Sequence, residues 1–154
     1  MSAADGPLAI RPATEADVPA AKALVERAYA VHLGVVDKPP APLFDDYAAH
    51  QAAGHLFVAG SGGTIAGLVV LIDAADHLLL DNVAVDPATQ GRGVGRALIA
   101  FAEAAARARG HHEVRLYTQE KMAANIALYR RLGFVETHRA VQDGFPRVFM
   151  TKRL

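Results

Sequence analysis

Residues 79–98 read LLDNVAVDPATQGRGVGRAL, and this stretch decides the fold. Its first half is an apolar run that ends at Asp86-Pro87, which is typical of a strand followed by a turn. Its second half places glycines at positions 91, 93 and 95, ahead of a helix that we expect over residues 93–109. Glycine lets the backbone approach a ligand closely, and the free N–H groups of a first helical turn attract anions, most often phosphate. The stretch therefore predicts an anion-binding turn, with Arg92 and Arg96 adding positive charge beside it.

Outward from this stretch, hydrophobic periodicity predicts a succession of strands and helices. We expect strands over residues 8–11, 55–59, 64–73, 77–85, 113–118, 134–141 and 147–152. We expect helices over residues 44–53, 93–109 and 123–132, and a further helix after Thr14, which stands three residues before Asp17 in a variant of the capping box. The order β-α-α-β-β-β-α-β-α-β-β predicts an α+β fold in which helices cover a mixed sheet.

Length and composition indicate one domain over residues 1–154, and they exclude several kinds of function. The 16 Lys and Arg residues balance 16 Asp and Glu residues, so we expect no nucleic-acid partner. The chain has no cysteine, which excludes a thiolate nucleophile, and Ser2 and Ser61 lack the nucleophile elbow of serine hydrolases. Residues 1–7 do not resemble a signal peptide and the apolar runs are short, so we expect a cytoplasmic protein without a membrane partner.

Two common phosphate-binding motifs do not fit the glycine turn. The spacing Gly91-x-Gly93-x-Gly95 differs from the Gly-x-Gly-x-x-Gly motif of the dinucleotide fold, and the Gly-Lys-Ser/Thr ending of a P-loop is absent. A plain alternative is a glycine-rich turn whose helix simply packs close to the sheet. Another alternative is a different nucleotide-phosphate binder.

A family resemblance favours a more specific interpretation. Gln90-x-x-Gly93-x-Gly95, after the strand that ends at Asp86-Pro87, resembles the acetyl-CoA-binding motif of the GNAT superfamily of N-acetyltransferases. Downstream, Asn125-x-x-x-Tyr129-x-x-Leu132-Gly133-Phe134 is similar to the second GNAT motif. The resemblance implies a splayed sheet and an acetyl-CoA-dependent N-acetyltransferase.

The resemblance also implies which residues bind the cosubstrate acetyl-CoA. A backbone cradle for the pyrophosphate would consist of Gln90, Gly91, Arg92, Gly93, Val94, Gly95 and Arg96. The pantetheine arm would lie along the strand at Val83, Ala84 and Val85, like an inserted strand. Asn125 would hold the pantetheine or the adenosine end, and Tyr129 would lie near the thioester sulfur.

The chemistry of acyl transfer suits these residue types. Attack of an amine on a thioester needs a neutral amine, a polarised carbonyl and a proton for the leaving thiolate. The Tyr129 hydroxyl can supply that proton, although the residue could instead be a packed helix aromatic. Asp81 is the candidate general base, directly or through water, although it could instead anchor a loop or face solvent. By strand alternation we expect Asn82 on the opposite face of the sheet.

The acceptor site is expected in the segments that vary within this fold, with Tyr29, His32, Tyr47 and Arg139 as candidate contacts. A small amine, an amino acid, an antibiotic and a protein N-terminus all remain open as acceptors. Because His111 and His112 are adjacent and no second ligand pair stands nearby, we expect no metal. The resemblance further implies a homodimer formed through the last strands. A catalytically silent CoA-binding sensor or partner subunit is the alternative function.

Overall fold

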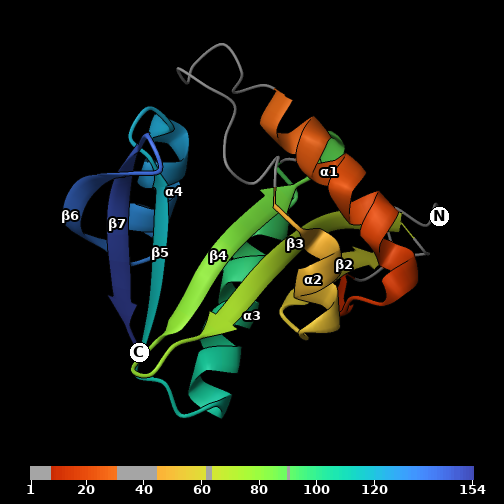
Figure 1. Ribbon diagram of the computed structural model, residues 1–154, viewed down its shortest axis with the longest axis horizontal. Coiled ribbons are helices and arrows are strands. Elements are labelled where there is room, and N and C mark those ends of the chain that lie inside the picture. Colours follow the sequence, from red (N-terminus) through yellow and green to blue (C-terminus); the bar gives the residue numbers. More distant parts are fainter. Residues whose placement is uncertain (1–7, 31–44, 62–63, 90) are drawn as a thin grey trace.

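A mixed sheet forms the centre of the molecule in a computed structural model that describes residues 8–30, 45–61, 64–89 and 91–154 (Figure 1). Within these residues the sheet has seven strands in the order β1-β2-β3-β4-β5-β7-β6. The strands are β1 (Ala9–Pro12), β2 (Leu56–Ser61), β3 (Thr64–Asp73), β4 (Leu78–Val85), β5 (Glu113–Gln119), β6 (Val135–Gln142) and β7 (Phe145–Arg153). The helices are α1 (Val18–Ala30), α2 (Tyr47–Ala52), α3 (Val94–Ala108) and α4 (Ala123–Arg131), with short 3-10 helices η2 (Glu15–Asp17) and η4 (Pro87–Thr89). The predicted α+β order of elements is confirmed.

The helices cover both faces of the sheet, and β3 shows why. Successive side chains of a strand point to opposite faces. Leu68 and Val70 pack in the core beneath α1 and α2, whereas Val69 and Leu71 pack in the core beneath α3. Figure 1 shows α1 and α2 on one face of the sheet and α3 on the other. None of the described helices is long and apolar enough to cross a membrane.

Most element bounds differ from the predicted ones by one to three residues, for local reasons. Helix α2 begins at Tyr47 because the carboxylate of Asp46 caps it, accepting a hydrogen bond from the Ala49 N–H at 3.0 Å. Strand β1 includes Pro12, which an edge strand tolerates because its outer N–H groups need no partner. The predicted loop over residues 31–42 lies outside the described residues.

The sheet divides at its middle, as the family resemblance implied. Strands β4 and β5 run parallel, but they pair only from Leu78 with Val114 to Leu80 with Leu116. Beyond these residues β5 stays paired with β7, and β4 stays paired with β3. The second half of β4 therefore separates from β5, as Figure 1 shows.

A β-bulge at Asp81 changes which side chains face the divided region. In the pairing of β3 with β4, Val70 lies opposite Asn82 and Leu71 lies opposite Leu80, so Asp81 is an extra residue. Asp81 lies beside the side chains of Asp45 and His50, next to α2, and Asn82 donates a hydrogen bond to a tyrosine of α2. Both side chains therefore face the side of α1 and α2. The prediction that Asn82 points to the opposite face is wrong, because the bulge breaks the alternation.

Candidate functional site

Two cavities meet where β4 and β5 separate. The larger, which we call the glycine groove, has an empty volume of about 1280 Å³ and runs past the start of α3 to α4. The smaller, which we call the central pocket, has an empty volume of about 540 Å³. The two cavities share the lining residues Tyr29, Val83, Met122, Asn125 and Tyr129. A ligand in one cavity can therefore touch a ligand in the other.

The predicted glycine turn lines the glycine groove. Gly93 is the N-cap of α3 in the left-handed conformation, with φ of 78°, which only glycine adopts readily. A Cβ on Gly91 or Gly93 would meet no atom within 4 Å, and one on Gly95 would meet Val85 at an ordinary 3.7 Å. No packing contact requires these glycines, which argues against the alternative of a glycine-rich turn whose helix simply packs close to the sheet. The close approach of α3 to the sheet occurs at Gly67 of β3 instead.

The start of α3 is anchored by an apolar residue and flanked by arginines. Val94 is buried in the core, so the first turn of the helix is fixed against the sheet. Arg92, Arg96 and Arg131 are all exposed, and Arg96 and Arg131 also line the glycine groove. Positive charge beside the free N–H groups of a helix start suits a phosphate-bearing ligand. Gln90 lies outside the described residues.

The second half of β4 forms one wall of the glycine groove. Val83, Ala84 and Val85 all line it. On one side these residues pair with β3, and on the other the described part of the chain places no strand beyond Leu80. The outer edge of β4 can therefore accept an extended ligand as though it were another strand.

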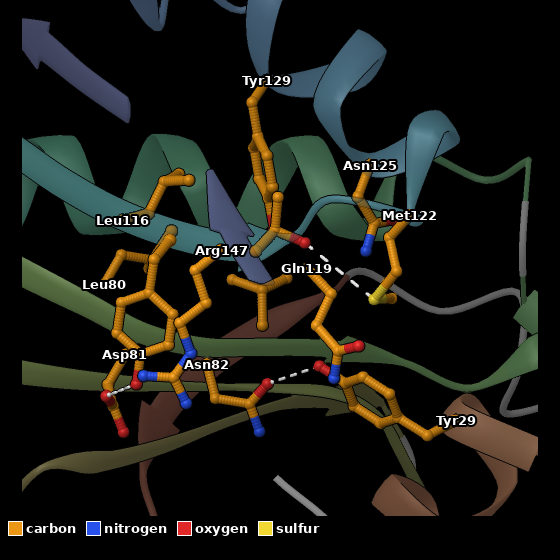
Figure 2. A pocket seen from close by; sticks show the side chains of 13 residues that line it. Tyr29, Leu80, Asp81, Asn82, Leu116, Gln119, Met122, Asn125, Tyr129 and Arg147 are labelled. Carbon is orange, nitrogen blue, oxygen red and sulfur yellow. Dashed lines mark hydrogen bonds between the residues drawn. The ribbon is translucent and has the colours of Figure 1, made fainter. Parts of the chain in front are cut away.

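Tyr129 lies on α4 at the junction of the two cavities (Figure 2). The residue is 9% exposed, and its ring packs edge-on against Phe134 at 5.9 Å between centroids. Burial raises the pKa of Tyr129 to about 12. Within the described residues the hydroxyl has no hydrogen-bond partner, yet no buried polar side-chain atom is left unpaired. The hydroxyl is therefore open to the cavities, while Asn125, one turn earlier on α4, lines both of them.

Asp81 lines the central pocket from the bulge of β4. Its carboxylate accepts a hydrogen bond from the Tyr117 hydroxyl at 2.9 Å, and burial together with the Asp81 charge raises the pKa of Tyr117 to about 12. One oxygen of Asp81, one oxygen of Asp45 and one ring nitrogen of His50 lie within 4.8 Å of one another. Histidine spacing alone could not reveal this group, because its members come from separate parts of the chain.

A chain of hydrogen bonds connects two of the predicted acceptor contacts through Asn82. The Tyr29 hydroxyl donates to Asn82 Oδ1 at 3.0 Å, and Asn82 Nδ2 donates to the Tyr47 hydroxyl at 2.9 Å. Burial raises the pKa of both tyrosines. Tyr29 lines both cavities, whereas Tyr47 is 2% exposed and supports the pocket from behind Asn82.

The remaining predicted contacts are not brought into the pocket. Arg139 lies on β6, exposed, where it forms ion pairs with Glu136 at 2.9 Å and Glu120 at 3.1 Å. It lines neither of the two cavities. His32 lies outside the described residues.

Sequence reasoning missed Arg147, which enters the central pocket from β7 (Figure 2). Its side chain is buried, and its guanidinium lies over the Tyr117 ring at 4.4 Å from the centroid. The available signal was a charged residue in an otherwise apolar strand between Phe145 and Val148. That signal does not say whether the charge faces solvent or a cavity.

Comparison with known proteins agrees with this arrangement. The profile of the Acetyltransferase (GNAT) family matches residues 21–134. A mycothiol acetyltransferase from Beutenbergia cavernae is 37% identical over 87 residues, which make up 56% of this chain and 29% of that protein. This chain thus spans less than a third of the length of that relative.

Solved structures share the fold over nearly the whole chain. The ribosomal-protein-S18-alanine N-acetyltransferase from Escherichia coli has a TM-score of 0.75 at 27% identity, covering 95% of this chain and 93% of that one. The structure of yncA from Salmonella typhimurium, solved with its cofactor acetyl-CoA, has a TM-score of 0.71 at 26% identity, covering 96% and 94%. With a family match over most of its length and the divided sheet in place, the chain belongs to the GNAT acetyltransferase family.

Proposed function

We propose that this chain is an acetyl-CoA-dependent N-acetyltransferase that moves the acetyl group directly to a primary amine within a ternary complex. The observation that carries the proposal is the shared lining of the two cavities, which includes Tyr129 and Asn125. Acetyl-CoA in the glycine groove and the acceptor amine in the central pocket would meet at these residues. Such an arrangement makes an enzyme nucleophile unnecessary, which is consistent with a chain that lacks cysteine.

The glycine groove fits acetyl-CoA by the chemistry of its walls. The first turn of α3 would hold the pyrophosphate through backbone N–H groups, with Arg96 and Arg131 adding charge. The open edge of β4 at Val83 and Val85 would bind the pantetheine arm by main-chain hydrogen bonds. The likeness to yncA, which was solved with acetyl-CoA, supports this placement.

Two residues that line the central pocket, Asp81 and Tyr129, would carry out the two proton transfers of the reaction. Asp81 would take a proton from the attacking amine, directly or through water, as the C–N bond forms. Tyr129 would give its hydroxyl proton to the thiolate as the C–S bond breaks, and would recover a proton from solvent. A pKa of about 12 keeps the Tyr129 hydroxyl protonated at neutral pH, which is the state that a proton donor needs.

The test is a transfer assay against a panel of amines. Release of the CoA thiol is followed with a thiol reagent, and the absence of cysteine means that the protein itself does not react. We expect acetyl-CoA to bind in calorimetry and at least one amine to be N-acetylated, as shown by mass spectrometry. Binding without transfer to any amine would favour the sensor or partner subunit. A larger thermal shift with ATP than with CoA would favour a different nucleotide binder.

A further inference from the structure

The central pocket contains a cationic side chain, that of Arg147, and most of its hydrogen-bond donors have no partner among the described residues. Arg147 is 8% exposed, and within the described residues it has one hydrogen-bond partner, the neutral Gln142 side chain at 3.0 Å from Nη1. It forms no ion pair with any described carboxylate. A guanidinium carries five N–H donors, so most of them remain available. Among the described residues no buried polar side-chain atom is unpaired, so the donor atoms of Arg147 that lack a partner keep some exposure, and Arg147 lines the central pocket.

The surroundings of Arg147 fix its position without neutralising its charge. The guanidinium lies 4.4 Å from the centroid of the Tyr117 ring and 5.6 Å from that of Phe145. Cation–π contacts of this kind offset part of the cost of burying the charge, but they use the face of the guanidinium and leave its edge free. The group that matches that edge is a carboxylate, which can accept two parallel hydrogen bonds.

A negative charge stands at the other end of the same tyrosine. The Tyr117 hydroxyl donates to Asp81 at 2.9 Å, while the Tyr117 ring lies beneath Arg147. Figure 2 shows Arg147 and Asp81 pointing into the pocket together. The Tyr117 side chain thus has the Arg147 guanidinium over its ring and the Asp81 carboxylate at its hydroxyl. One small molecule could contact both charged groups.

We propose that the acceptor is a small amine that also carries a carboxylate, that is, a free amino acid or a close analogue. Its nitrogen would lie between Asp81 and Tyr129, and its carboxylate would bind the edge of Arg147. The inference rests on the proposed function, because it names the substrate class of that site. A peptide N-terminus fits less well, since an amide replaces the carboxylate. A phosphate of the donor is also a poorer match, because Arg147 does not line the glycine groove.

The experiment compares matched amines. The twenty common L-amino acids, β-alanine and γ-aminobutyrate are assayed with acetyl-CoA beside their carboxamides and their decarboxylated amines. We expect kcat/KM for the best amino acid to exceed kcat/KM for its carboxamide and for its decarboxylated amine by at least about tenfold. This is the contribution of a hydrogen bond to a charged group. Arg147→Gln should remove this preference, because it should lower kcat/KM for the amino acid by at least about tenfold more than kcat/KM for the carboxamide. Arg147→Lys, which keeps the charge but loses the fork, should retain part of the preference.

Arg139→Gln is the matched control, because Arg139 is an exposed arginine on the adjacent strand and lines neither cavity. It should leave the preference intact. Carboxamides that react as well as amino acids in the wild type would overturn the inference, as would a preference that survives in Arg147→Gln. If Arg147→Gln fails to fold by circular dichroism, the wild-type preference and Arg147→Lys decide.

Failure of the proposed function is separable from failure of the inference. If the wild type transfers acetyl to no amine, the same amino acids are tested as ligands by thermal shift. An amino acid that raises the Tm of the wild type and of Arg139→Gln, raises that of Arg147→Lys by less, and leaves that of Arg147→Gln unchanged would still support carboxylate recognition. No shift with any of them would overturn it.

Discussion

At the scale of single residues, Tyr129 is the sharpest test of the chemistry. If its hydroxyl protonates the departing thiolate, Tyr129→Phe should lower kcat and kcat/KM together by about 10²-fold, because the lost interaction matters only in the transition state. Acetyl-CoA affinity and Tm should hardly change, since the ring still packs on Phe134. Steady-state kinetics with an accepted amine measure kcat and kcat/KM, and calorimetry on the same variant measures the affinity for acetyl-CoA.

The pH profile gives a second readout for Tyr129. Because burial raises its pKa to about 12, the hydroxyl remains protonated across the range in which most amines are assayed. We therefore expect no loss of kcat from this group up to about pH 10, where an unperturbed tyrosine is already half ionised. An unchanged kcat in Tyr129→Phe, at a rate limited by chemistry, would remove the residue from the mechanism.

A substitution at Gly95 distinguishes an effect on ligand binding from an effect on folding better than a substitution at the neighbouring glycines. Gly95→Ala adds a Cβ that meets only Val85 at 3.7 Å, inside the lining of the glycine groove. Within a helix this change should stabilise the fold by up to about 1 kcal/mol, while the methyl group obstructs the bound ligand. We expect a raised Tm and acetyl-CoA binding weakened by at least about tenfold, with thermal unfolding and calorimetry as the measurements.

The contrasting variant is Gly93→Val. Gly93 has φ of 78°, so a β-branched residue there strains the backbone as well as blocking the groove. It should lose both binding and some stability. Normal acetyl-CoA binding by both variants would show that the ligand phosphates lie elsewhere.

At the scale of elements, the short helix η2, which leads into α1, depends on one carboxylate. Asp17 accepts the Thr14 N–H at 2.7 Å and two hydrogen bonds from Arg11, at 2.7 and 3.0 Å. The Arg11 guanidinium, then the Thr14 N–H, lower the pKa of Asp17. Asp17→Asn should therefore cost about 1 kcal/mol of unfolding free energy at pH 7, the usual value for a helix cap. Urea unfolding would measure it, with Glu15→Gln as a control that removes a charge from the same turn.

The contribution of Asp17 should depend on pH in a fixed direction. Its pKa is lower in the folded protein than in the unfolded chain, where it is about 3.9. The stabilisation is then complete above that value and declines as the pH falls below it. The difference in stability between the wild type and Asp17→Asn should accordingly narrow steadily as the pH falls from about 4 to 2. A difference that stays constant over that range would show that the carboxylate charge is not responsible.

The sequence predicts elements well where their periodicity is local, as in α3 and β3, and predicts the cavity less completely. The glycine turn and Tyr129 are recognisable because their spacing is fixed within one segment. The bulge at Asp81 is not, because it exists only in the pairing of β4 with β3. Arg139 and Arg147 lie on the two strands of one hairpin, and nothing local tells which one enters the pocket.

At the scale of the whole molecule, the two halves of the sheet meet through three residue pairs of β4 and β5. A ligand along β4 that also contacts α4 should bind both halves together. We expect saturating acetyl-CoA to raise the unfolding free energy by about 2.7 kcal/mol at 100 times its Kd, and to slow amide exchange in residues 81–85. Hydrogen exchange with and without acetyl-CoA measures this, and β2, which lies away from the groove, serves as the internal reference.

The homodimer stays a prediction. Strand β6 is the outer strand of the sheet, and its Val135 and Val141 are 66% and 71% exposed. If the last strands pair between subunits, light scattering should show twice the monomer mass, and Val141→Lys should shift it towards the monomer. A wild type that is monomeric at high concentration would contradict the expectation.

The edge of β4 that no described strand pairs beyond Leu80 has a further consequence, which concerns solubility. An exposed strand edge is a template on which another chain can add, and proteins commonly blunt such edges with charge or cover them. Here Val83 to Val85 present an apolar edge that the cosubstrate would cover. The ligand-free protein should therefore aggregate faster than the acetyl-CoA-bound protein at equal concentration. The same contact that positions the donor would then also protect newly made chains from self-association.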